Sequence, residues 1–509
     1  MKKYINIILS ISLFVPIYGR ENPNDNASSS SIWSRFAGKT TAIDQYSLIN
    51  IGNMEYWVKE DGTSCHTAEG GSGGIYPRST AGAIYLDGVL VGGYQGGNLK
   101  VSGQIYRTGT VKGYIGANGV ATDGVRMYRI RKDWATLSPA MVRQETAEYF
   151  EIPIGSVTDA DIQVVLDNYA TDWAEWPTHL GAPYYDLNNN GVYEPDLGET
   201  PGIANADQVL WFVCNDGDPT TTADLYGTEP MNIEMQMTLW GYNQPGASLG
   251  QIVFKQIRII NKSSEDITDA YISQWSDPDL GDYGNDLVGV DTSLSLMYAY
   301  NGEATDAQYS AFGLAPAAIG YDYFAGPKVV SPGDTAIFNL KKLPGYKNLP
   351  ASSFGYFSAG GTYSDPGPYG NVEAAREYYN LMRGYAPIDD LDNPTAWLDE
   401  NGAPTRYPYA GDPVSGTGHL DSSPGDRRML INAGPFTLAA GDTQDVVEAV
   451  VGGLGDNQLS SITDMKFTDQ VAQALFDDLF QSVPSAPSAP KVSVTTTEES
   501  VVLNWGDDL

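Results

Sequence analysis

The chain lacks positive charge over two long stretches. No Lys or Arg occurs between Arg143 and Lys255, where there are 18 acidic residues, and none occurs between Lys262 and Lys328, where there are 11. Across 509 residues, 29 basic residues stand against 63 acidic ones, a net charge of −34. This charge argues against binding to nucleic acid or docking on anionic lipid, which both depend on Lys and Arg. We expect other cations to balance part of the carboxylates.

Cysteine and histidine are also scarce. The chain has two cysteines, Cys65 and Cys214, and three histidines, with no CxxC motif or Cys/His cluster of the kind that holds structural zinc. A disulfide between the two cysteines is allowed in an exported protein, and two separate buried thiols are the alternative. No HExxH motif is present. The sequence therefore favours a protein without enzymatic activity.

No apolar run reaches about 18 residues, the length expected of a membrane-spanning helix. Residues 1–19 instead predict a secretory signal peptide, because Lys2 and Lys3 precede an apolar run that ends near a small residue, Gly19. Residues 20–44 are polar and predict a flexible lead-in. We expect the mature chain to have no membrane span and to be secreted or displayed at the cell surface.

Glycine, proline and tyrosine are abundant, at 56, 30 and 33 residues, and favour many turns between short strands. Alternating side chains over Ile233–Leu239 and Val253–Ile260 predict successive antiparallel strands. Thr158 and Asp161 have the spacing of a capping box and predict the start of a helix. The expected fold is mainly β, with antiparallel β-sandwich domains, a few inserted helices and the start of a fibronectin type III domain at the end.

The domain boundaries follow changes in composition. Residues 45–205 are expected to form an N-terminal β-rich domain with a helical segment over 138–176. Residues 206–482 are expected to form a β-sandwich region with acidic loops and a C-terminal helix. Residues 483–490 predict a Pro-rich linker. Residues 491–509 resemble the first two strands of a fibronectin type III domain, which suggests a fragment of a longer polypeptide.

The first candidate metal loop resembles the front half of an EF-hand, with oxygen-bearing side chains spaced two apart before a Gly turn. A complete EF-hand is excluded, because position 12 is Leu197 rather than Glu. A dockerin-like calcium loop completed by Glu194, Asp196 or Asp207 remains open, as does an Asn-Gly turn with solvated side chains. The ligands expected for Ca²⁺ are Asp186, Asn188, Asn190, the Val192 carbonyl and Asp196.

The second candidate loop follows a predicted strand and is dense in aspartate. Such hard oxygen ligands suit Ca²⁺ better than Mg²⁺, which keeps more of its water. The alternative is a solvated acidic rim. The ligands expected here are Asp277, Asp279, Asp282 and Asp286. Arg427 and Arg428, one of the few basic pairs, are expected to form ion pairs with some of the many carboxylates.

Paired carboxylates across a groove are also the mark of glycosidases. Four tryptophans, if exposed, are suited to stacking on sugars: Trp173, Trp176, Trp240 and Trp275. These residues predict an alternative function, a secreted carbohydrate-active hydrolase using paired Asp or Glu. Geometry separates the two readings: convergence on one point indicates a metal, whereas two carboxyl groups about 5–9.5 Å apart across an open groove indicate hydrolysis.

Nine short motifs occur in a characteristic order along the chain: Tyr128–Asp133, Gly181–Asp186, Ala206–Trp211, Trp275–Gly281, Tyr378–Gly384, Gly411–Pro413, Gly425–Arg428, Gly434–Thr437 and Gly441–Gln444. In these motifs the chain resembles large uncharacterised secreted bacterial proteins that carry fibronectin type III modules and a C-terminal type IX secretion sorting domain. The resemblance covers most of residues 45–505, and the sorting domain is absent from this sequence. It implies export and surface display, and it implies no activity.

The sequence thus predicts a secreted or cell-surface, calcium-stabilised β-sandwich protein of several domains. Its role would be structural, adhesive or glycan-binding, with an extracellular glycan or a cell-surface component as partner.

Overall fold

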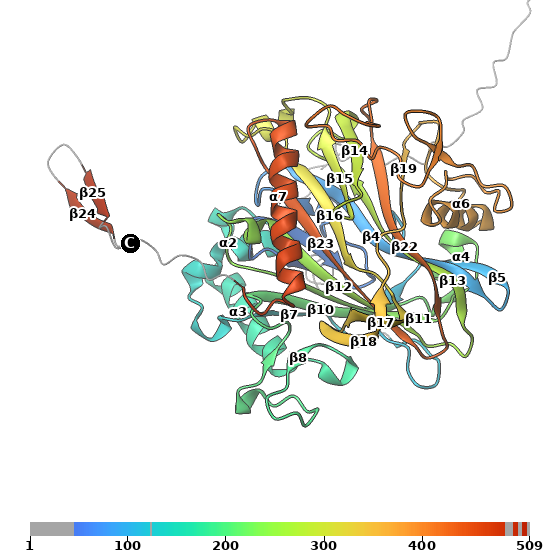
Figure 1. Cartoon of the computed structure of the whole chain (residues 1–509). Helices are drawn as coiled ribbons and strands as arrows, with labels where there is room; N and C mark the ends of the chain where they lie inside the picture. Colours follow the sequence, from blue (N-terminus) through green and yellow to red (C-terminus); the bar gives the residue numbers. More distant parts are fainter. Residues whose placement is uncertain (1–44, 123–124, 484–491, 497–500, 506–509) are drawn as a thin grey trace, which may run out of the picture.

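The computed structural model describes residues 45–122, 125–483, 492–496 and 501–505, and it is mainly β as predicted (Figure 1). The predicted signal peptide (1–19), the lead-in (20–44) and nearly all of the linker (483–490) lie outside the described residues.

The first large sheet has eight antiparallel strands. In spatial order they are β1 (Tyr46–Ile49), β2 (Glu55–Lys59), β3 (Gly74–Ile75), β4 (Gly82–Gln95), β13 (Ile267–Pro278), β22 (Arg427–Leu438) and β19 (Ser353–Ser358), with β5 (Asn98–Gly103) paired to β4.

The second large sheet has nine antiparallel strands. In spatial order they are β14 (Asp286–Asp291), β15 (Leu296–Asn301), β16 (Ala318–Ala325), β23 (Thr443–Gly453), β12 (Ile252–Asn261), β11 (Ile233–Gly241), β10 (Gln208–Asn215) and β6 (Val111–Lys112), with β7 (Tyr128–Arg131) also paired to β10.

The predicted domain boundary between residues 205 and 206 is wrong, because strands from both sides of it share both sheets. Strand β4 pairs with β13, where Leu90 lies opposite Ser273, and β7 pairs with β10, where Ile130 lies opposite Val209. Alternation along the sequence identifies a strand by its two faces. It carries no information about which distant strand becomes the neighbour.

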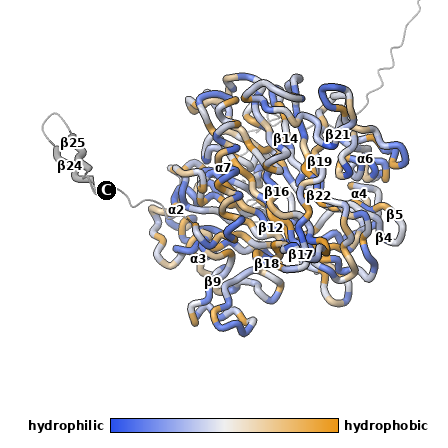
Figure 2. The backbone as a smooth tube through the Cα atoms, in the orientation of Figure 1, coloured by the Kyte–Doolittle hydropathy of each residue, from blue (hydrophilic) through white to orange (hydrophobic). Residues whose placement is uncertain are grey.

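The main hydrophobic core lies between the two sheets. Strand β11 directs Met235, Met237 and Leu239 into it, and β4 contributes Ile84 and Val89 from the opposite sheet. Full burial of such a side chain contributes about 1.5–3 kcal/mol. The intervening residues of β11 are buried as well, because the outer face of this sheet is also covered. Figure 2 shows the apolar strands gathered in the interior.

Helices cover the outer faces of both sheets (Figure 1). Helix α7 (Gln458–Asp477) lies across β16 and β23 and packs Ile462, Met465 and Phe476 into a second core. Helices α4 (Pro219–Tyr226) and α6 (Val372–Met382) cover the other sheet, where Tyr378 packs in a third core with Trp275. Across the described part of the chain, no helix has the length and apolar character that a membrane crossing requires.

The other helices and small sheets lie around these layers. The helices are α2 (Pro139–Tyr149), α3 (Asp159–Ala174) and α5 (Ala307–Ser310). The two-stranded sheets pair β8 (Tyr184–Tyr185) with β9 (Thr200–Pro201), β17 (Lys328–Phe338) with β18 (Lys341–Asn348), and β20 (Trp397–Leu398) with β21 (Pro404–Thr405). The predicted capping box at α3 is confirmed, since Thr158 and Asp161 each accept from the other's backbone N–H.

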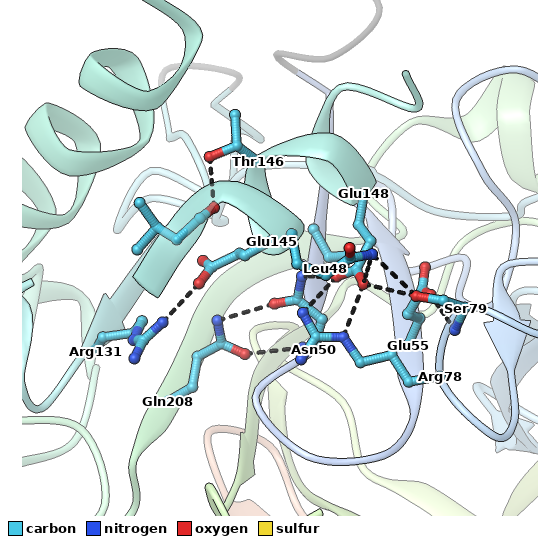
Figure 3. A network of polar contacts seen from close by, with 12 residues as sticks. Leu48, Asn50, Glu55, Arg78, Ser79, Arg131, Glu145, Thr146, Glu148 and Gln208 are labelled. Atoms are coloured by element: carbon cyan, nitrogen blue, oxygen red, sulfur yellow. Dashed lines mark hydrogen bonds and ion pairs between the residues drawn. The ribbon is translucent and has the colours of Figure 1, made fainter. Parts of the chain in front are cut away.

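Helix α2 is held to the sheets by a polar network (Figure 3). The Glu148 carboxylate accepts hydrogen bonds from the Arg78 guanidinium at 2.8 and 2.7 Å and from the Asn50 amide at 2.7 Å. One turn away, Glu145 accepts from Arg131 at 2.7 Å. Two acids of one helix thus bind three polar side chains from three other segments.

Of the two alternatives for the cysteines, the structure has two separate buried thiols rather than a disulfide, because Cys65 and Cys214 are both free. The Cys65 sulfur lies 3.5 Å from an Asp87 carboxylate oxygen, and the Cys214 sulfur lies 3.9 Å from the Gln104 amide nitrogen. Each thiol thus has its own polar neighbour within the core.

The C-terminal segment contains two antiparallel strands, β24 (Val492–Thr496) and β25 (Val501–Trp505), which form a sheet of their own. The two predicted strand-like runs are therefore present. The assignment to a fibronectin type III domain stays a prediction.

Candidate metal centre

Three aspartates converge where β13 ends and β22 begins. Asp277 lies near the end of β13, Asp279 follows it, and Asp426 directly precedes β22. The two strands are antiparallel neighbours, and Ser276 pairs with Met429. This register brings the acidic end of β13 next to a segment that is remote in the sequence.

The carboxylates are close enough to share one cation. One oxygen from each of Asp277, Asp279 and Asp426 lies within 4.8 Å of the others, and Asp277 and Asp279 are only 1% and 2% exposed. Oxygens bound to Ca²⁺ at 2.3–2.6 Å lie at most about 5 Å apart, so this separation fits a common ion. Carboxylate oxygens are hard ligands and suit Ca²⁺ or Mg²⁺ rather than zinc.

Arg428 supplies the nearest protein cation. Its guanidinium lies 3.4 Å from Asp277, 3.0 Å from Asp426 and 3.6 Å from Asp365, and it also contacts the Tyr106 hydroxyl. The same hydroxyl donates to Asp277 at 2.9 Å. The expectation of structural ion pairs is confirmed for both arginines, because Arg427 pairs with Asp421 at 2.8 Å.

One guanidinium cannot neutralise the acids around it. Asp286 is fully buried, and one of its carboxylate oxygens has no hydrogen-bond partner among the described residues. Burial, together with the charge of Asp277 and other nearby acids, raises the pKa of Asp286 well above its usual range. Burial also raises the pKa of Asp365. The site therefore has an excess of negative charge that either protons or a cation must offset.

The second acidic loop supplies two of its four predicted residues to this cluster. Asp286 is nearby, whereas Asp282 is exposed and uses its carboxylate to accept from the Gly284 N–H at 3.0 Å. Between Asp279 and Asp282 the loop turns sharply at Gly281, whose φ is +74°. A Cβ there would lie 2.1 Å from the Asp306 carboxylate, so only glycine fits. The turn directs Asp282 away from Asp279.

The first acidic loop brings together a different set of oxygens. The Asp186 carboxylate accepts from the Gly191 N–H at 2.8 Å, and the Asn188 and Asn190 amides both donate to Glu194 at 2.9 and 2.7 Å. The Gly191 N–H lowers the pKa of Asp186.

A residue that was not predicted, Glu199, takes part in this loop. Glu199 is 1% exposed and accepts from the Leu187 and Glu194 N–H groups at 3.1 and 2.7 Å. Val192 is exposed, and Asp196 lies exposed in a short 3-10 turn. Glu194 and Glu199, rather than Asp196, therefore accept the hydrogen bonds that hold this loop.

The alternative site for hydrolysis does not match this geometry. Asp277 and Asp279 are buried rather than placed across an open groove. Trp176, Trp240 and Trp275 are 3%, 0% and 0% exposed, so they pack in cores and present no face to a sugar. The exposure that sugar stacking requires is therefore not met by these three tryptophans.

Sequence reasoning did not identify Asp426, Tyr106, Asp365 or Glu199 as site residues. Asp426 precedes the Arg427-Arg428 pair, and that pair was the one available signal for a nearby group of acids. Neither a comparison with protein-family models nor a search of curated proteins finds a match to this chain.

Proposed function

We propose that this protein acts outside the cell as a calcium-stabilised β-sandwich with a structural, adhesive or glycan-binding role. The observation that carries the proposal is the convergence of Asp277, Asp279 and Asp426 within 4.8 Å, in a buried position at the junction of β13 and β22. A divalent ion there would tie two long strands and the loop before β14 together. The leader-like first residues and the net charge of −34 agree with export into a medium rich in divalent cations.

The chemistry of the site favours a structural ion over a catalytic one. The three carboxylates and Arg428 are largely enclosed, with Asp277, Asp279 and Arg428 each at most 2% exposed. A catalytic ion needs an open position for water or substrate. A buried ion with protein ligands instead stabilises the folded state, by about 2.7 kcal/mol when calcium exceeds its Kd a hundredfold.

Isothermal titration of the calcium-free protein with Ca²⁺ tests the proposal. Asp279→Asn removes one charge from the three-carboxylate cluster and is expected to weaken calcium binding at that site by at least about tenfold, given the ligand charge dependence of such sites. Asp282→Asn is the matched control, because Asp282 belongs to the same loop and lies outside the cluster. Equal binding by the two variants, or no calcium binding by the unchanged protein, would refute the calcium site.

A glycan array probed with and without Ca²⁺ tests the proposed partner class. Binding to a defined set of glycans by the folded protein would support the glycan-binding role. Hydrolysis of any of them would instead support the hydrolase alternative.

A further inference from the structure

A lysine is buried between the two large sheets among carboxyl groups. Lys255 on β12 and Glu448 on β23 are each 1% exposed, and Asp87 on β4 is fully buried. Lys255 and Glu448 lie directly opposite each other within one sheet, whereas Asp87 comes from the other sheet. Two acids and one amine leave an unbalanced charge in the interior when all are ionised, which is a costly arrangement.

The amine lies between the two carboxylates. Its Nζ atom is 2.7 Å from Glu448 Oε1 and 3.9 Å from Asp87 Oδ1, and it donates to the Gln274 side-chain oxygen at 2.8 Å. Groups that react within a protein approach to about 3–3.5 Å. A small side-chain movement therefore brings the amine within reach of the Asp87 carboxyl carbon.

Two tyrosines polarise the Asp87 carboxyl group. The Tyr56 hydroxyl donates to both Asp87 oxygens at 2.8 and 2.7 Å, and the Tyr321 hydroxyl donates to Oδ2 at 2.8 Å. The Ser276 hydroxyl, in turn, donates to the Tyr321 oxygen at 2.9 Å. Fixed donors in a dry site withdraw electron density from the carboxyl carbon and stabilise the oxyanion that forms when a nucleophile adds to it.

We propose that Lys255 and Asp87 form an intramolecular isopeptide bond that joins the two sheets, with Glu448 as the catalytic acid and base. Glu448 first removes a proton from the Lys255 ammonium group. The neutral Nζ then attacks Cγ of Asp87, and the Tyr56 and Tyr321 hydroxyls stabilise the resulting oxyanion. Glu448 transfers two of the ammonium protons in turn to one Asp87 oxygen, the C–O bond breaks, and that oxygen leaves as water. Ammonium and carboxylate give amide and water, without oxidation or reduction.

The protonation behaviour of Lys255 and Glu448 agrees with these roles. Burial lowers the pKa of Lys255, but Glu448 and Asp87 outweigh it and the pKa is raised overall, so the amine needs a base before it can attack. Burial raises the pKa of Glu448, which makes it better able to hold a proton in transit. The bond converts a buried ammonium and a buried carboxylate into a neutral amide, which lowers the charge enclosed between the sheets.

The bond would also fix the sandwich covalently. Asp87 and Lys255 lie far apart in the sequence and on opposite sheets, so a link between them restricts the unfolded chain strongly. A protein of the cell exterior, exposed to proteolysis and shear, would gain from this without needing a disulfide. The proposal does not depend on the metal centre.

Mass spectrometry of the purified full chain under denaturing conditions tests the bond. The expected mass is below that of the same polypeptide without the link by one water molecule, and a digest should contain a branched peptide that joins the Asp87 and Lys255 segments. An unmodified mass with no branched peptide would overturn the proposal. A branch from Lys255 to Glu448, or to Gln274 with loss of ammonia, would overturn the choice of Asp87 as the acyl group.

Variants separate the roles of the three residues. Lys255→Arg and Asp87→Ala are expected to restore the full mass. Glu448→Gln keeps the amine and the acyl group and is expected to slow bond formation by about a hundredfold or more, the usual contribution of general acid–base catalysis. Asp445→Asn is the matched control, because it breaks an ion pair with Arg258 at 2.9 Å on the same two strands and should leave the linked mass unchanged. The unaltered protein decides the question even where a variant fails to fold.

Discussion

The guanidinium of Arg428 lies 3.4 Å from the Asp277 carboxylate, so the candidate metal centre already contains one protein cation. Both side chains are almost fully buried, at 2% and 1% exposed. The charge of Arg428 and the charge of a bound ion therefore act on the same carboxylates and should substitute for each other in part.

We expect Arg428→Gln to lower the free energy of unfolding by about 3–5 kcal/mol in EDTA, because it leaves buried carboxylates uncompensated. Calcium should recover more stability in this variant than in the unchanged protein. Guanidinium denaturation in EDTA and in Ca²⁺ measures both effects. Lys342→Gln, at an exposed position on β18, is the control. An equal calcium response in all three proteins would contradict the shared-charge explanation.

The two acidic loops should contribute separately to calcium stabilisation. Asp186→Ala and Asp279→Asn should each reduce the rise in Tm that Ca²⁺ produces. Converted to free energies of unfolding, the two losses should add in the double variant to within about 0.5 kcal/mol, as expected of independent sites. Asp196→Ala, in the exposed turn of the first loop, should change little. Differential scanning calorimetry with Ca²⁺, with equal Mg²⁺ and with EDTA measures these shifts. A melt indifferent to all three would contradict calcium stabilisation and would leave protons to offset the buried charge at the three-aspartate cluster.

Local sequence patterns predicted the elements of this fold well. The alternation at Ile233–Leu239 and Val253–Ile260 corresponds to β11 and β12, and the Thr158 capping box begins α3. These signals are local, because side-chain direction and helix capping depend on residues only a few positions apart.

The pairing of distant strands and the full metal cluster were not predictable in the same way. Asp279 and Asp426 meet only because β13 pairs with β22, and the sequence between them contains strands of both sheets. Asp282 lies outside the three-aspartate cluster for a local reason, because the left-handed turn at Gly281 directs it away from Asp279. Burial of Trp240 and Trp275 likewise depends on helices contributed from elsewhere in the chain.

The network beneath α2 in Figure 3 should behave as one unit. Glu148→Ala removes the acceptor of the Arg78 and Asn50 hydrogen bonds and should lower the free energy of unfolding by about 1–3 kcal/mol, the usual cost of leaving largely buried donors without a partner. Gln144→Ala is the control, because Gln144 is exposed and its amide donates to Glu148 at 3.0 Å and to Ser79 at 3.1 Å at the edge of the network. Its effect should stay within about 0.5 kcal/mol. Urea denaturation at neutral pH compares the two, and equal losses would show that the network contributes no more than an exposed contact.

Asp322 on β16 and Asp469 on α7 are two neighbouring buried acids. They are 1% and 0% exposed, and burial together with the neighbouring Asp469 carboxyl group raises the pKa of Asp322, so we do not expect both acids to be ionised together. Burial raises the pKa of Asp469 to about 7 and that of Asp322 well above its usual range. An acid whose folded pKa is raised favours folding fully below its unfolded pKa, about 3.9. Stability is then lost as the pH rises towards the folded pKa.

We therefore expect the docking of α7 to weaken between about pH 4 and pH 7, the window set by the unfolded and folded pKa of Asp469. Asp469→Asn cannot ionise, so it should flatten this dependence and raise the free energy of unfolding at pH 8 by roughly 1–4 kcal/mol. Asp477→Asn, at an exposed position on the same helix, should leave most of the slope in place. Guanidinium denaturation from pH 4 to pH 8 gives the slopes. If Asp469→Asn and the unchanged protein lose stability in parallel as the pH rises, the proton is not shared between these two acids.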